Sequence, residues 1–243
     1  KYVLVPDSAH GTNPASAYIC GYEIKEIKSS PEGILEAKTV AEVMNEDVAA
    51  IMITNPNTLG VFEKNFKEIA EIVHSKGGLV YMDGANLNAL MGYVKPAEIG
   101  ADVLHFNLHK TFATPHGGGG PGSGPVGVVK KLEEFLPNPR VVKDGNKFDW
   151  LTDNKNSIGR IKLFWGNFGV LVRAYVYLKA IGADGLKDVT EKAVLNANYV
   201  RAKLLGKFEL PYSLASLHEC VFSDKIQSAN GIKTLDIAKR LMD

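Results

Sequence analysis

Three neighbouring segments decide the fold that this sequence encodes: VAAIMIT at residues 48–54, NFKEIAEIVHSK at 65–76 and GLVYMD at 78–83. The first and third segments are short apolar runs, typical of strands that are buried on both faces. The middle segment repeats its apolar residues at helical spacing, and Gly77 follows it at the position where a left-handed residue commonly ends a helix. A strand, a helix and a strand in this order predict two parallel strands joined by a covering helix.

The same alternation continues on both sides of these segments. YVLV at 2–5, YEIKEI at 22–27 and ADVLHFNL at 101–108 are further strand-like runs, and a helix is expected to begin near Pro14. The fold class is therefore α/β, with a mostly parallel sheet that is flanked by helices.

The pattern becomes helical after about Asn167, through GVLVRAYVYLKAIG at 169–182 and VTEKAVLNANYVRAKLLG at 189–206. We expect residues 1–165 to form a large domain, and 166–243 to form bridging helices and the start of a smaller C-terminal α+β domain. The chain does not begin with Met and stops inside a helical pattern, so we expect it to be truncated at both ends.

The composition excludes several classes of protein. The 243 residues are 45% hydrophobic and 23% charged with a net charge of +1, which is too weak a field to indicate nucleic acid or a membrane as partner. No signal peptide and no run of about 18 apolar residues is present, so we expect a soluble, intracellular, cytoplasmic protein. Cys20 and Cys220 show neither disulfide nor zinc spacing, which predicts buried free thiols and no metal.

The segment NLHKTFATPHGGGGPGSGP at 107–125 places Lys110 just after an apolar strand and before a run of glycines and prolines. A lysine facing a cleft can form an imine with a carbonyl group, although taken alone an exposed loop lysine is the commoner case. The glycine run lacks the Gly-Lys-Ser/Thr ending of a nucleotide-binding P-loop. A closely packed loop beside a cofactor fits it better.

Polar side chains also follow the other predicted strands. Asp83 ends a buried strand, where a carboxylate needs a cationic partner unless it only caps the next turn. His10 and Thr12 follow the first strand, and could meet a planar or anionic ligand or serve as caps. Asn55 and Asn57 follow the third strand, where they could face the same cleft or shape the turn. In open α/β sheets ligands bind at the carboxyl ends of the strands, so these ends predict one site.

The chain resembles the large domain of fold type I pyridoxal-phosphate enzymes in the order of four residues, which are His10, Asn55, Asp83 and Lys110. Four stretches are similar to the signature segments of one family, the glycine cleavage system P-protein, which is the decarboxylating glycine dehydrogenase. They are AHGTNPASA, TNPNTLG, MDGANLNA and NLHKTFATPHGGGGPGSGPVGV. The resemblance covers essentially the whole chain. It is greatest to the C-terminal half, which in many bacteria is a separate second subunit.

The resemblance implies that residues 1–165 bind pyridoxal 5′-phosphate. Lys110 would hold the cofactor covalently, Asp83 would pair with the pyridine nitrogen and His10 would stack on the ring, and these three are the expected catalytic residues. Thr12, Ala85, Asn55 and His109 are further expected cofactor-binding positions. No segment upstream of His10 corresponds to the usual phosphate-binding turn, so we expect that turn to be missing.

The resemblance also implies the reaction and the partners. Glycine would lose carbon dioxide, and the aminomethyl group would pass to the lipoyl arm of the H-protein, with Gly117–Gly120 as one wall of the channel for that arm. Pairing with the other P-protein subunit or half is expected, in the cytoplasm or, in a eukaryote, the mitochondrial matrix. Two alternatives remain open, which are another fold type I enzyme (an aminotransferase or amino-acid decarboxylase) and a non-catalytic truncated scaffold.

Overall fold

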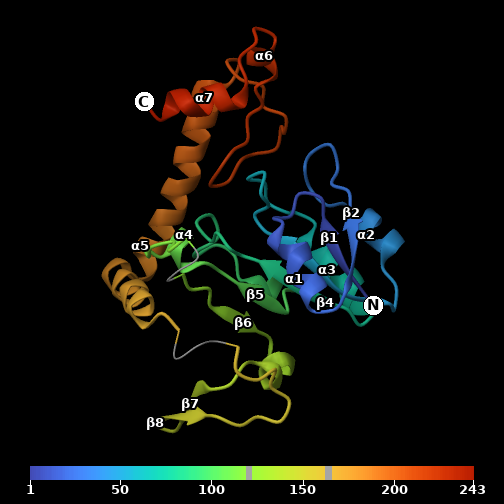
Figure 1. Cartoon of the computed structure of the whole chain (residues 1–243), viewed down its shortest axis with the longest axis vertical. Helices are drawn as coiled ribbons and strands as arrows, with labels where there is room; N and C mark the ends of the chain where they lie inside the picture. The colour runs from blue at the N-terminus through green and yellow to red at the C-terminus, as the bar shows by residue number, and fades with distance from the viewer. Residues whose placement is uncertain (119–121, 162–165) are drawn as a thin grey trace.

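The computed structural model describes residues 1–118, 122–161 and 166–243, and a six-stranded sheet forms its centre (Figure 1). The strand order is β2-β1-β3-β4-β5-β6; the first five strands run parallel, and β6 runs antiparallel to β5. The strands are β1 (Tyr2–Pro6), β2 (Glu23–Ile27), β3 (Val48–Thr54), β4 (Leu79–Asp83), β5 (Val103–His105) and β6 (Val126–Val128). The predicted α/β class with a mostly parallel sheet is confirmed.

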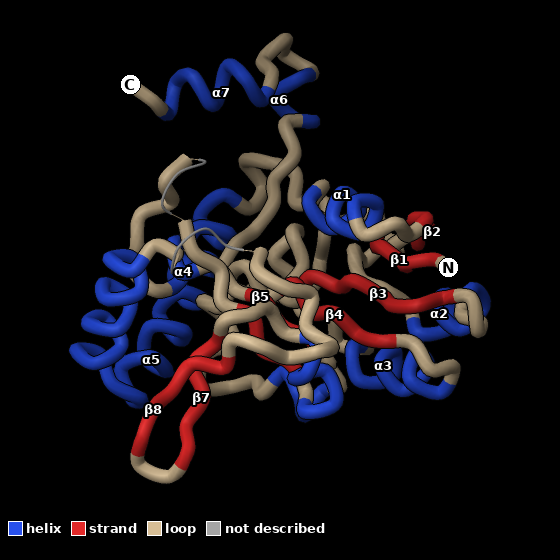
Figure 2. The backbone as a smooth tube through the Cα atoms, turned by 60° about the horizontal axis from the view of Figure 1, so that its bottom comes forward, coloured by secondary structure: helices blue, strands red, loops and turns tan. Residues whose placement is uncertain are grey.

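Helices cover both faces of this sheet (Figure 2). They are α1 (Thr12–Ile19), α2 (Ala37–Val43), α3 (Phe66–Ser75), the 3-10 helix η1 (Pro96–Ile99) and the one-turn helix α4 (Leu108–Thr111). Ile51 and Ile53 of β3 belong to the same buried cluster as residues of α2 and α3, whereas Met52 belongs to a second cluster with Ala17 of α1. Successive side chains of a strand point to opposite faces, so the two clusters lie on opposite sides of the sheet.

Helix α3 forms as its sequence predicts. Phe66, Ile69 and Val73 are fully buried against the sheet, which matches their helical spacing. Gly77 follows the last turn with a φ of 77°, a left-handed conformation that glycine adopts without strain. The helix therefore ends just before β4 begins.

Strand β2 and Cys20 are more exposed than the rest of the sheet region, and for Cys20 this contradicts a prediction. Four of the five residues of β2 are exposed, because β2 is the edge of the sheet and no further strand covers it. Cys20 is an exposed free thiol rather than a buried one, since it directly follows the exposed end of α1; Cys220 is partly buried and also free.

The remainder of the chain lies beside and beyond the sheet (Figure 1). It comprises η2 (Lys130–Phe135), the hairpin of β7 (Arg140–Asp144) and β8 (Lys147–Leu151), α5 (Phe168–Leu204), α6 (Lys225–Ser228) and α7 (Thr234–Leu241). Helix α5 spans both predicted helical stretches and is interrupted at Gly182, where φ is 69° and ψ −179°. Because residues 162–165 lie outside the described part of the chain, the division into domains after residue 165 stays a prediction.

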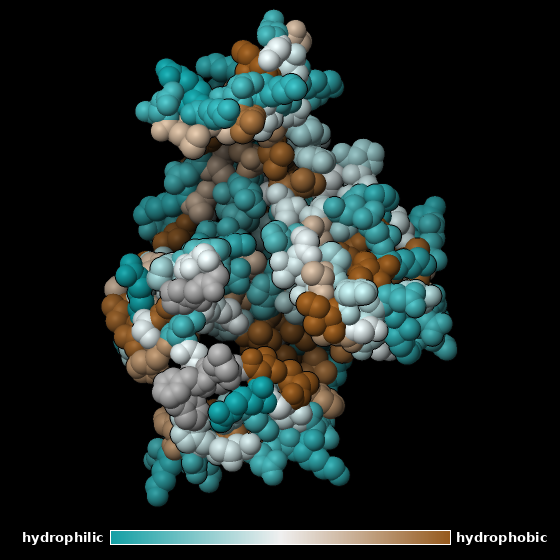
Figure 3. Space-filling model, in the orientation of Figure 1, coloured by the Kyte–Doolittle hydropathy of each residue, from teal (hydrophilic) through white to brown (hydrophobic). Residues whose placement is uncertain are grey.

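The first half of α5 presents apolar side chains to the surface. Phe168, Val172, Tyr175 and Val176 are between 43% and 69% exposed, and apolar side chains appear at this edge of the molecule in Figure 3. Contiguous apolar surface of this kind is typical of an interaction face. Among the described residues, no helix is long and apolar enough to cross a membrane.

Candidate active site

A pocket of about 240 Å³ opens where the parallel strands end. Thr54, Asp83 and His105, the last residues of β3, β4 and β5, all line it. Among the predicted site residues His10, Thr12, Asp83, Ala85 and Lys110 line this pocket, whereas Asn55 and His109 do not. The strand-end rule for open α/β sheets therefore describes the position of the pocket.

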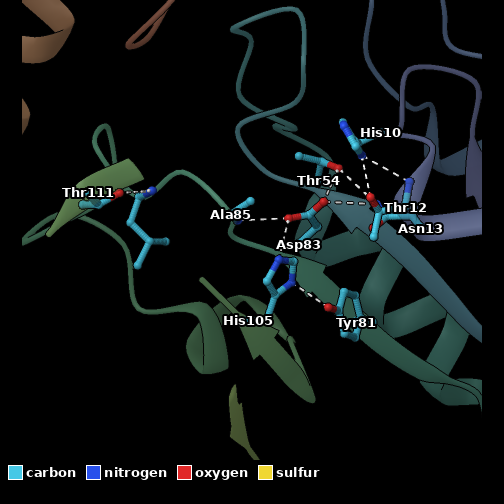
Figure 4. Close-up of polar contacts among 10 residues, drawn as sticks. His10, Thr12, Asn13, Thr54, Tyr81, Asp83, Ala85, His105 and Thr111 are labelled. Atoms are coloured by element: carbon cyan, nitrogen blue, oxygen red, sulfur yellow. Dashed lines mark hydrogen bonds and ion pairs between the residues drawn. The ribbon is translucent and has the colours of Figure 1, made fainter. Parts of the chain in front are cut away.

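Asp83 is a buried carboxylate held on both of its oxygens (Figure 4). The backbone N–H of Ala85 donates to Oδ1 over 2.9 Å, and the side chains of Asn13 and Thr54 donate to Oδ2 over 3.2 and 3.3 Å. Nε2 of His105 lies 3.5 Å from Oδ1. Hydrogen bonds of this kind fix the direction of a carboxylate.

His105 and Tyr81 are polar residues of the site that sequence reasoning missed. The Tyr81 hydroxyl lies 2.5 Å from Nδ1 of His105, and the two rings are stacked (Figure 4). Burial, with a contribution from the Asp83 charge, raises the pKa of Tyr81 to about 12, so the hydroxyl keeps its proton and can donate it. Burial lowers the pKa of His105; the Asp83 charge opposes this effect and the Lys110 charge adds to it. A neutral ring that accepts from Tyr81 at Nδ1 carries its proton on Nε2, toward Asp83.

His10 lies at the exposed mouth of the pocket, on the loop between β1 and α1. The backbone N–H of Thr12 donates to Nδ1 of His10 over 3.1 Å, and the Thr12 hydroxyl lies 2.8 Å from the same nitrogen. These contacts orient the ring through Nδ1 and leave Nε2 for another group. Thr12 is also the first residue of α1, so the sequence places both side chains at the start of that helix.

Lys110 lies in the one-turn helix α4 rather than at the end of β5. Leu108 and Phe112 bury this turn in an apolar cluster with Val170 and Ala174 of α5. The turn is tied to the loop after β4 as well, because Thr111 Oγ1 accepts from the backbone N–H of Leu87 over 3.1 Å (Figure 4). Lys110 itself is exposed, and its Nζ has no hydrogen bond or ion pair among the described residues.

Asn55 and His109 contact other groups. Asn55 is fully buried, its Oδ1 accepts from the Glu63 backbone N–H over 3.1 Å, and its Nδ2 has no hydrogen bond within the described residues. Asn57 binds Glu63 Oε1 over 2.8 Å in the same loop. Burial raises the pKa of Glu63, although hydrogen bonds from Asn57 and Leu35 oppose it. These contacts shape the loop after β3.

His109 packs edge-on against the ring of His116, with 4.5 Å between centroids. Burial, together with the charges of His116 and Lys110, lowers its pKa. Of the glycines that were expected to form a channel wall, Gly117 and Gly118 are exposed, whereas Gly119 and Gly120 lie outside the described residues. The roles expected for Asn55, His109 and these glycines stay predictions.

The C-terminal part of the chain also reaches the pocket, through His218 and Glu219. Sequence reasoning did not single out these two residues, because nothing in their local pattern marks them. Their position depends on how the segment after α5 folds back. The backbone N–H of Leu217 donates to the carbonyl of Gly60 over 2.7 Å, which joins this segment to the loop after β3.

Taken together, the pocket combines an amine that has no partner within the described part of the chain, a buried and oriented carboxylate and an imidazole at the mouth. An amine of this kind can bond covalently to an aldehyde. The carboxylate of Asp83 can hold a protonated ring nitrogen, and the imidazole of His10 can face a planar ring. These groups fit pyridoxal phosphate, whose aldehyde, ring nitrogen and ring face need such partners.

Comparisons with known proteins agree with this chemistry. A family model described as "Aminotransferase class-V" matches residues 4–120, and one described as "Glycine dehydrogenase, C-terminal domain" matches residues 189–243. Proteins named "Probable glycine dehydrogenase (decarboxylating) subunit 2" from several strains of Staphylococcus aureus are 59% identical over 241 residues, which is 99% of this chain. The chain spans about half (49%) of the length of these curated relatives.

Solved structures share the fold. A glycine decarboxylase (P-protein) of the glycine cleavage system, in inhibitor-bound form, matches 84% of this chain and 48% of its own with a TM-score of 0.68 at 24% identity. A sphingosine-1-phosphate lyase from Burkholderia pseudomallei matches 84% of this chain and 46% of its own, with a TM-score of 0.63 at 15% identity. At these identities the likeness shows the fold alone.

Proposed function

We propose that the chain belongs to the family of decarboxylating glycine dehydrogenases and that it carries the pyridoxal 5′-phosphate site of an enzyme that decarboxylates glycine. The observation that carries the proposal is the grouping of Lys110, Asp83 and His10 around one pocket. These three residues come from separate elements, which are helix α4, the end of strand β4 and the loop between β1 and α1. A protein with no ligand has no evident need to bring to one pocket a buried carboxylate and an amine that has no partner among the described residues.

When bound, the cofactor supplies an electron sink for the pair of electrons that glycine retains as carbon dioxide leaves. Asp83 contributes by keeping a proton on the ring nitrogen, which requires that its carboxylate stay charged and correctly directed. Its hydrogen bonds from Ala85 and Asn13 serve that purpose. The Tyr81–His105 pair contacts the same carboxylate at Oδ1.

Lys110 has two tasks in this proposal. Its Nζ would hold the cofactor covalently, and the same amine could accept or return a proton beside the substrate. The amine has no competing partner among the described residues, and the packing of α4 against α5 fixes the backbone that carries it. His10 would lie against the face of the ring, oriented through Thr12. Thr12 and Ala85 line the same pocket as further cofactor contacts.

The partners belong to the same proposal. The family relationship supports transfer of the aminomethyl group to the lipoyl arm of an H-protein and a cytoplasmic location. The exposed apolar side chains of α5 supply a face suited to pairing with the other subunit or half of the protein.

The test is borohydride reduction of the full-length protein incubated with pyridoxal phosphate, followed by mass mapping of the modified peptide. We expect the cofactor mass on the peptide that contains Lys110, and none in Lys110→Ala. Lys131→Ala is the matched control, since Lys131 is paired with Asp102 at the amino ends of β4 and β5, away from the pocket. Labelling of another lysine, or of none, contradicts the proposal.

A second candidate is another enzyme of the same fold type, because the model that matches residues 4–120 is that of class-V aminotransferases. The two differ in the product made from glycine. Exchange of the glycine carboxyl group with labelled carbon dioxide that depends on a lipoyl protein indicates the decarboxylase. Transfer of the amino group to a keto acid, without such exchange, indicates an aminotransferase.

A further inference from the structure

His218 is a buried histidine whose ring nitrogens have no hydrogen-bond partner among the described residues. Its side chain is only 4% exposed. Nε2 lies 3.2 Å from Oε1 of Glu219, a charge contact without hydrogen-bond geometry. Leaving a buried polar group unpaired costs free energy, so the ring needs an explanation.

The backbone on both sides of His218 is fixed by contacts with other segments of the chain. The Leu217 N–H donates to the Gly60 carbonyl over 2.7 Å, and Asn198 Nδ2 donates to the Ser216 carbonyl over 2.7 Å. Gly60 packs so closely that a Cβ there would lie 2.0 Å from the carbonyl oxygen of Glu219. Contacts from the loop after β3 and from α5 therefore fix the segment on both sides of His218.

His218 lines the same pocket as Lys110 and differs from the other buried polar residues there. Asn13, Asn57 and Asp83 are buried and each has hydrogen-bond partners within the protein. His218 has none, and it belongs to the C-terminal segment rather than to the strand ends. A ligand that brings a hydrogen-bond acceptor into the pocket would pair with a ring nitrogen of His218. Because this side chain is already buried, little further conformational entropy would be lost in immobilising it.

We propose that His218 binds the carboxylate of the amino-acid substrate and selects for it, a proposal that rests on the function proposed above. An α-amino acid needs an anion partner for its carboxylate in addition to the covalent site for its amine. An imidazole N–H donating to a carboxylate makes a charge-assisted hydrogen bond, which is stronger than a neutral one. The ring would donate to the substrate carboxylate from one of its two nitrogens, neither of which has a hydrogen bond among the described residues.

The test compares two amines in the cofactor-loaded, full-length protein. Glycine and methylamine both carry the reacting amino group, and only glycine carries a carboxylate. The dissociation constant of each is measured from the change in the visible absorbance of the bound cofactor. In His218→Leu we expect the constant for glycine to rise about 10- to 100-fold, with the constant for methylamine changed less than about twofold.

Further variants make the outcome clear if one protein folds poorly. His218→Met is a second apolar replacement of similar length and is expected to show the same selective loss. His218→Gln restores a donor, and should recover part of the discrimination between the two amines. His74→Leu is the matched control. His74 pairs with Asp102 at the amino ends of β4 and β5, opposite the pocket, so its loss should leave that discrimination unchanged.

Two results would overturn the proposal. Equal weakening of glycine and methylamine would mean that His218 only shapes the pocket. Weaker cofactor binding with unchanged glycine affinity would mean that the anion it binds is the cofactor phosphate. Failure of the proposed function is distinguishable from both, because the parent protein would then show no cofactor on Lys110 and no spectral response to either amine.

Discussion

At the residue scale, Asp83 and Asp102 are both buried aspartates, and they lie at opposite ends of β4. Asp83 faces the pocket, whereas Asp102 accepts from the Val80 backbone and contacts His74 and Lys131. Burial by itself raises the pKa of Asp102, but hydrogen bonds from Lys131, Val80 and His74 outweigh it and the net pKa is lowered. Similar carboxylates therefore have different tasks, one at the site and one in the scaffold.

We expect Asp83→Asn to retain the cofactor but to reduce glycine decarboxylation by orders of magnitude, because an amide cannot keep the ring nitrogen protonated. The measurement is exchange of labelled carbon dioxide with glycine in the full-length protein. Asp102→Asn is the control; it should lower stability without a comparable effect on the rate of exchange. Near-normal exchange in Asp83→Asn would remove this carboxylate from the mechanism.

Tyr81 offers a second prediction at this scale. Its hydroxyl is the partner of His105 Nδ1, so Tyr81→Phe leaves a buried nitrogen unpaired beside Asp83. We expect a loss of about 1–3 kcal/mol in the free energy of unfolding, measured by urea denaturation. The exchange of labelled carbon dioxide with glycine should be slower, and cofactor binding should be intact. An unchanged free energy of unfolding and an unchanged rate of carbon dioxide exchange would show that the Tyr81–His105 contact contributes to neither.

At the scale of elements, the docking of the C-terminal segment on the loop after β3 depends on Gly60. This residue has a φ of 79° and lies against the Glu219 carbonyl. Gly60→Ala should therefore destabilise the protein by about 2 kcal/mol or more, combining backbone strain with a steric clash. Faster hydrogen exchange at residues 216–220 would identify the released segment.

Gly77→Ala is the matched control for this substitution. Gly77 has nearly the same φ, 77°, but a Cβ there would meet nothing within 4 Å. Only the strain of the left-handed conformation should remain, about 1 kcal/mol. Equal losses in the two variants would indicate that the contact with Glu219 adds nothing.

At the scale of the whole molecule, two partly buried histidines make stability depend on pH. The folded state lowers the pKa of His105, chiefly through burial, and that of His109 in the same way. Below the ordinary histidine pKa of about 6.5 the unfolded chain therefore binds more protons than the folded one. Their contribution is fully present above that pH and is lost progressively as the pH falls.

We therefore expect the free energy of unfolding to decrease as the pH is lowered from about 7 to 5, measured by urea denaturation at each pH. His105→Gln should be less stable at pH 7 but show a shallower dependence over this range. An equally steep dependence in that variant would assign the effect to other groups.

The sequence by itself determined the order of the elements and the edge at which the pocket forms. Local periodicity separates strands from helices, and parallel strands joined by helices bring their carboxyl ends together, so His10, Asp83 and Lys110 could be assigned to one edge in advance. Only the tertiary structure decided the partners of these residues. His105 lies beside Asp83 because β4 and β5 pair in that register, and His218 reaches the pocket because a distant segment packs on Gly60. Such contacts depend on register and on packing between segments far apart in sequence, neither of which leaves a periodic signal in the chain.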